Sequence, residues 1–287
     1  MRKNIRQTVA IFAVIAALTS GCRSSEEYKK LTKAGNEYAI AVNELLTAAG
    51  DIRIESNSEK LLQDDKILNQ SETDYRTLSQ QDEDWLKILN DIRTHNELLQ
   101  AYFSKLQALA TSDAPEQAKT EIDGIAGNLN SIGHKLQNST LITNKSILQG
   151  ATNLVISSQI RGALREELEK RHEVILKELT IQQEVLNTVS SSIEQDVKSI
   201  KSAQEVRLVI RPLIQIEPIK NEDEWIKTRK NILLMDRKIE EIKKASTALR
   251  EFKEIFQASL EGKLTQARLN EHLQDIDTFF ALIQNTK

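Results

Sequence analysis

Apolar residues recur at steps of three and four along almost the whole chain. The longest of these stripes runs from Leu168 to Ile210, and the others begin at Tyr28, Trp85, Ala118, Trp225 and Leu269. Such spacing places apolar side chains on one side of an α-helix, because about 3.6 residues complete a turn. Stripes of this length are typical of helices that pack as bundles or coiled coils. The sequence therefore predicts an all-α protein, an elongated bundle of antiparallel, coiled-coil-like helices.

The composition excludes several other classes of protein. The 287 residues include 3 Pro and 9 Gly, which are too few for the frequent turns of a β-sandwich or β-barrel. A single Cys forms neither an intramolecular disulfide nor a thiolate-rich metal site. Because 39 Lys and Arg residues are balanced by 42 Asp and Glu residues, we expect no nucleic-acid partner.

The motifs of catalytic and metal sites are incomplete. Glu169 and His172 fit one Glu-x-x-His half of a di-iron bundle site, but no other histidine has a glutamate three residues before it. His172-Glu173 is followed by Leu176 where a zinc-protease motif needs histidine. No nucleophile elbow and no phosphate-binding glycine loop is present. We expect no catalytic residues, no cofactor and no metal.

The N-terminal segment has the layout of a secretory signal. Arg2, Lys3 and Arg6 precede an apolar or small run over residues 8–18, which is too short to span a membrane. The only cysteine of the chain follows in Ser20-Gly21-Cys22. This segment resembles the signal peptide of bacterial lipoproteins, although Thr19 stands where leucine is commonest in their lipobox.

The lipoprotein resemblance implies cleavage before Cys22, which removes residues 1–21 as a signal peptide. It also implies lipidation of the Cys22 thiol and acylation, typically with palmitate, of the new amino group. Residues 22–27 would then form a lipidated tether, and residues 28–287 an all-helical body. Because Arg23 rather than aspartate follows the cysteine, the resemblance favours the outer membrane over the inner membrane of a Gram-negative envelope. An ordinary signal peptide with an incidental cysteine is the alternative.

Residues 208–220 interrupt the helical pattern. Pro212 and Pro218 are incompatible with a continuous helix, and Ile214 and Ile216 alternate with polar residues. We expect an extended crossover between two long helices here, in a pattern that would also suit a short strand. Before it, one helix could extend from about Thr143 to Arg211.

Several residues mark helix boundaries. Pro115 and Thr265 suit helix starts, and Gly262 suits a helix end. Acidic residues before an aromatic residue predict three further starts, at residues 26–29, 82–87 and 222–227. Gly124 and Gly127 lie within a helical pattern and predict a close approach of a neighbouring helix.

Some polar residues lie within the apolar stripes. Gln182 and Asp196 resemble the buried polar positions that set the register of coiled coils. Arg207 would pair with an acidic residue such as Glu205 or Glu217; the alternative is that its side chain simply extends to solvent. His95 and His172 are expected to be ordinary bundle histidines with one polar partner; the alternative is a pH-sensitive role.

A surface for a partner helix is predicted at Gly150, Leu154, Ser158 and Gly162, which lie four residues apart and form a strip of mostly small side chains. They belong to the segment Leu141–Leu164, the richest in apolar residues. Polar residues such as Asn144 and Arg161 interrupt this segment, so it is not expected to span a membrane.

Together these features predict a membrane-anchored envelope lipoprotein that is not an enzyme. It would act as a scaffold, adaptor or accessory protein that binds a protein partner through helical surfaces, at Leu141–Leu164 or at the crossover. The alternative is a periplasmic ligand-sensing helical bundle, with a small molecule held near Trp85, His95 and Tyr102.

Overall fold

The computed structural model describes the backbone of residues 2–64, 71–111, 115–142 and 154–284. Within these ranges it describes side chains except at residues 2–27, 64, 237–248, 250, 277 and 279–284. All statements below concern these described residues.

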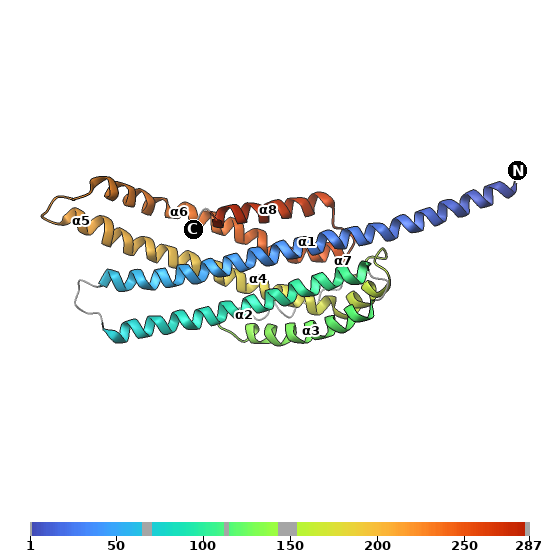
Figure 1. Cartoon of the computed structure of the whole chain (residues 1–287), viewed down its shortest axis with the longest axis horizontal. Coiled ribbons are helices and arrows are strands. Elements are labelled where there is room, and N and C mark those ends of the chain that lie inside the picture. Colours follow the sequence, from blue (N-terminus) through green and yellow to red (C-terminus); the bar gives the residue numbers. More distant parts are fainter. Residues whose placement is uncertain (1, 65–70, 112–114, 143–153, 285–287) are drawn as a thin grey trace.

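The protein is an elongated all-α bundle, as predicted. Its elements are α1 (Arg2–Asp64), α2 (Glu72–Thr111), α3 (Glu116–Gln137), α4 (Gly162–Gln204), the π-helix η2 (Glu205–Ile210), α5 (Arg211–Ile214), α6 (Glu222–Arg250), α7 (Phe252–Leu260) and α8 (Gln266–Gln284). The long helices lie side by side along one axis, and the N-terminal part of α1 extends beyond the others (Figure 1). The 43 residues of α4 alone span about 65 Å. Within the described ranges no residue belongs to a β-strand.

Among α1, α2, α4 and α6 the helix directions alternate as in an antiparallel bundle, whereas α3 runs parallel to α4. The Thr32 hydroxyl on α1 donates to the Phe103 carbonyl late in α2, and the Asn57 amide late in α1 donates to Asp82 early in α2. These contacts require α1 and α2 to run in opposite directions. Helix α4 runs back parallel to α1, and α6 returns antiparallel to α4 (Figure 1).

The predicted stripes face the core. Those of α1 and α4 make the largest contributions, with the buried residues Leu31, Tyr38, Val42, Leu45, Leu168, Ile175, Leu179, Leu186, Val189 and Ile193. Aromatic rings then join the C-terminal helices to this core. Phe252 of α7 stacks on Tyr38 with ring centroids 4.6 Å apart, and the Phe103 ring meets Phe252 edge-on at 5.2 Å.

Four of the predicted helix boundaries are confirmed. Helix α3 begins directly after Pro115, and α7 ends at Leu260, shortly before Gly262. Helix α6 begins at Glu222, where the Asn221 side chain accepts a hydrogen bond from the Glu224 backbone N–H at 3.1 Å. Helix α8 begins after Thr265, whose hydroxyl accepts from the Arg268 N–H at 3.2 Å. Residues 82–87 do not start a helix; α2 already begins at Glu72.

The earlier start of α2 has a local cause. Ser71 and Asp74 cap it reciprocally: the Ser71 hydroxyl accepts from the Asp74 N–H, and the Asp74 carboxylate accepts from the Ser71 N–H. Residues 26–29 likewise lie inside α1. Acidic residues suit the solvent face of a helix interior as well as a first turn, so their presence alone does not locate a boundary.

The predicted crossover is shorter than residues 208–220. The helical path continues through η2 and α5 to Ile214, and only residues 215–221 between α5 and α6 are non-helical. Pro212 is tolerated because it lies in the first turn of α5, where its missing N–H removes no intrahelical bond. The preceding N–H, that of Arg211, bonds to the Val206 carbonyl in the wider π-helical turn.

The long helix predicted from Thr143 begins only at Gly162. Residues 154–161 are irregular, and residues 143–153 lie outside the described residues. Gly162 has φ of +64°, a conformation that glycine adopts without strain, so the chain turns into α4 at this position.

The predicted tether at residues 22–27 is helical and forms part of α1. No break in the helix therefore marks the predicted boundary between tether and body. Among the described residues, no helix has both the length and the hydropathy needed to cross a membrane.

The glycine that permits close packing is Gly133, not Gly124 or Gly127. A Cβ atom added at Gly133 would overlap the Glu178 carboxyl group of α4, whereas one added at Gly124 or Gly127 would meet nothing within 4 Å. Gly133 thus provides the space on α3 in which the Glu178 side chain lies.

Replacing Gly133 by alanine should therefore destabilise the bundle. We expect Gly133→Ala to lower the free energy of unfolding by about 1–3 kcal/mol through overpacking. The matched variant Gly127→Ala, on the exposed side of the same helix, should raise it by about 0.5–1 kcal/mol because alanine favours helix. Urea denaturation followed by circular dichroism measures both, and equal effects of the two variants would contradict this account.

Candidate functional site

The most completely buried polar group of the bundle centres on His95 of α2. Its Nδ1 lies 2.7 Å from Gln182 Oε1 and its Nε2 lies 3.0 Å from Glu178 Oε2, both on α4. The imidazole therefore bonds through both of its ring nitrogens to α4.

This histidine group is closed to solvent. The side chains of His95 and Glu178 are 0% and 1% exposed. The geometry therefore suits a structural link between α2 and α4, and no solute has direct access to the imidazole.

The three side chains suggested for a ligand pocket do not come together. Trp85 and Tyr102 are separated by 17 positions of α2, about 25 Å along the helix. The Arg53 guanidinium lies over the Trp85 ring, with its central carbon 5.3 Å from the ring centroid. The Tyr102 hydroxyl donates to Glu167 on α4 at 3.3 Å and is buried. His95 lies between them.

The second histidine of the predicted pair has a local role. His172 is half-buried, and its Nδ1 donates to the Leu168 carbonyl of the preceding turn at 2.7 Å. Around it and elsewhere in the described chain, no three His, Cys, Asp or Glu side chains are arranged as metal ligands.

The predicted small-residue strip is not a helical surface. Gly150 lies outside the described residues, Leu154 and Ser158 belong to the irregular segment, and Gly162 starts α4. The segment packs against the end of α7 instead, where the Ser157 N–H donates to the Leu260 carbonyl at 2.8 Å. A spacing of four residues indicates a shared face only if the residues are helical.

The sequence also offered no reason to single out His272, which is buried on α8. Its ring lies 5.9 Å from that of Phe252, and neither ring nitrogen has a hydrogen-bond partner among the described residues. Burial lowers the pKa of His272 from 6.5 to about 4, which Asp275 opposes and Arg268 reinforces.

The surface feature most suggestive of function is a group of exposed apolar side chains at one end of the bundle. We call Ile210, Leu213, Ile214 and Ile216 the tip; they extend from the end of η2 through α5 into the following loop. Ile214 is 73% exposed and Ile216 fully exposed. The tip and the N-terminus of α1 lie at opposite ends of the molecule (Figure 1).

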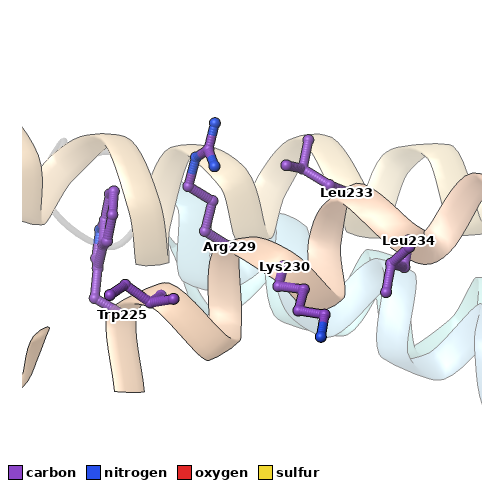
Figure 2. Close-up of a pocket in the computed structure, with 6 residues that line it drawn as sticks. Trp225, Arg229, Lys230, Leu233 and Leu234 are labelled. Atoms are coloured by element: carbon purple, nitrogen blue, oxygen red, sulfur yellow. The ribbon is translucent and has the colours of Figure 1, made fainter. Parts of the chain in front are cut away.

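The apolar surface continues along α6. A shallow hollow there is lined by Trp225, Ile226, Arg229, Lys230, Leu233 and Leu234. Figure 2 shows Arg229 and Leu233 extending to one side of the helix and Lys230 and Leu234 to the other. Clustered exposed apolar side chains with charged neighbours are typical of protein-interaction surfaces.

Comparison with known proteins adds no relative. No protein-family model, no curated protein and no solved structure matches this chain.

The burial of His272 predicts a pH-dependent stability. Folding keeps the imidazole neutral down to about pH 4, whereas the unfolded chain takes up a proton near pH 6.5. The contribution of His272 to the free energy of unfolding is therefore complete above pH 6.5. It is lost as the pH falls toward 4, by up to ~1.4 kcal/mol per pH unit.

The variant His272→Leu isolates this contribution. We expect its free energy of unfolding to fall less than that of the wild type between pH 6.5 and pH 4, as measured by urea denaturation at several pH values. Parallel pH profiles of the two proteins would refute the assignment.

Proposed function

We propose that the protein is a membrane-anchored, non-catalytic scaffold or adaptor of the cell envelope that binds a partner protein through its tip. The observation that carries the proposal is the tip itself, a set of exposed apolar side chains at the end of the rod farthest from the N-terminal segment. An anchor at one end and a binding surface at the other would let the bundle hold a partner at a distance from the membrane.

The N-terminal sequence supports the anchor. Cleavage before Cys22 would leave a body with 36 basic and 42 acidic residues, since residues 1–21 contain three of the basic residues and no acidic one. Such an acidic body gains little from anionic headgroups. Stable attachment then depends on more than one acyl chain, because a single chain gives only marginal membrane binding.

The interior supports a binding role over a catalytic one. The buried polar groups at His95, Glu167 and Asp196 bond to other side chains across helices and are covered by them. Groups used in this way stiffen the bundle and fix its helices relative to one another, as a support for a binding surface requires.

The anchor is tested by Cys22→Ser. If Cys22 is lipidated, the wild type should incorporate labelled palmitate and remain in the membrane fraction. The variant should incorporate no label and should be released from the membranes. Unchanged labelling and fractionation would overturn the lipoprotein interpretation.

The tip is tested by site-specific photo-cross-linking in cells. A photoreactive side chain at Ile216 should give a discrete adduct with another protein. The matched control is Val155, which is 82% exposed but lies in the irregular segment before α4, and it should not give this adduct. The same adduct from both positions, or none from Ile216, would contradict binding through the tip.

A further inference from the structure

The outer face of α6 carries a regular stripe that the bundle does not use. Its members lie at helical steps of three and four, and they are Glu222, Asp223, Ile226, Arg229, Lys230 and Leu233. We call these residues the α6 stripe. Ile226 and Leu233 are 57% and 47% exposed, although both are large aliphatic residues.

The α6 stripe points away from the core. On the opposite side of the helix Ile232 is buried at 2% exposure, and the Trp225 indole N–H donates to the Val209 carbonyl at 3.1 Å. These contacts fix the rotation of α6 about its axis. Ile226 and Leu233 are consequently directed to solvent, seven residues apart, at the spacing that coiled-coil seams use.

Charge is divided along the stripe in a particular order. Glu222 and Asp223 occupy its beginning, and Arg229 and Lys230 lie about two turns further on. Within the described chain none of these four side chains has an ion pair or a side-chain hydrogen bond. The stripe therefore has an acidic half and a basic half, separated by Ile226, and both are free to pair with another molecule.

We propose that the α6 stripe is the contact surface for a second copy of this chain, with the two α6 helices antiparallel. A two-fold axis at Ile226 brings the two Ile226 side chains together. It places Glu222 and Asp223 of each copy beside Lys230 and Arg229 of the other. One surface thus supplies both halves of the contact, as a symmetric dimer requires.

The order of charges selects the antiparallel arrangement. In a parallel pair, Arg229 and Lys230 of one copy would face Arg229 and Lys230 of the other. Glu222 and Asp223 would likewise face Glu222 and Asp223. Like charges in contact are unfavourable, so that arrangement is disfavoured. The antiparallel pair joins two rods near their tips and leaves their N-termini at opposite ends (Figure 1).

The contact is small. One helix face with two exposed aliphatic residues, Ile226 and Leu233, buries less surface than the standard interface of about 1,600 Å². The association is therefore expected to be reversible, and weakened by salt because its ion pairs lie at the surface.

Disulfide trapping tests this arrangement. In full-length protein carrying Cys22→Ser, the substitution Ile226→Cys introduces a single thiol on the two-fold axis. Mild oxidation of the purified protein in detergent should convert it to a covalent dimer. The control Val174→Cys, at a 40% exposed aliphatic position on α4, should remain monomeric under the same conditions.

Charge exchange tests the pairing itself. Adding Arg229→Glu and Lys230→Glu to the Ile226→Cys protein should abolish the cross-link, because the whole stripe then becomes acidic. Adding Glu222→Lys and Asp223→Lys to that variant should restore the cross-link, because the acidic and basic halves of the stripe have then exchanged places. All these positions are exposed, and unchanged urea midpoints would show that folding is intact.

Three results of these experiments would contradict the antiparallel dimer. No dimer from Ile226→Cys, a dimer insensitive to charge reversal, or no rescue by charge exchange would each overturn the proposal. The first result would leave the stripe as a surface for a partner other than a second copy. Since the trapping uses Cys22→Ser protein and no other protein, it is independent of the anchor and of the adduct at Ile216.

Discussion

The pairing of buried polar side chains between α4 and its neighbours is the constraint on which the rest of the structure depends. Apolar stripes alone allow two helices to slide by a heptad at little cost, since one aliphatic side chain replaces another. A buried polar group must meet its partner or lose its hydrogen bonds. His95 with Gln182, and Arg53 with Asp196 at 2.9 Å, therefore determine how α4 lies along α2 and α1.

The position of the tip follows from this register. The helical path of α4 continues into η2 and α5, and Arg207 of η2 forms a two-oxygen pair with Glu59 of α1. This contact, together with the Trp225 bond to the Val209 carbonyl, holds the end of the bundle. The apolar residues of the tip are thereby presented on a fixed support even though they lack contacts of their own.

The two proposed interactions use different parts of the same end. The tip lies on η2, α5 and the following loop, whereas the α6 stripe lies on the outer side of the returning helix. A dimer through α6 would place two tips near each other, so a partner with two binding sites would be held more tightly than by a single tip.

Local sequence patterns determined the helical class and most of the core. Long aliphatic stripes with little proline or glycine admit few other folds, and the capping residues at Asn221 and Thr265 act within a single turn. The sequence also indicated that Gln182 and Asp196 are buried polar positions, because they interrupt an otherwise apolar stripe. All of these features depend on neighbours within a few residues, which a sequence displays directly.

Only the tertiary structure decided which distant residues meet. Arg207 pairs with Glu59, 148 positions away, and not with the nearby Glu205 or Glu217, because α1 passes beside η2. The space for Glu178 is provided by Gly133, whereas Gly124 and Gly127 of the same helix face solvent. Leu154 and Ser158 do not share a helical face, because residues 154–161 are irregular. In each case the outcome depends on helix rotation and register, which long-range packing sets and no local pattern records.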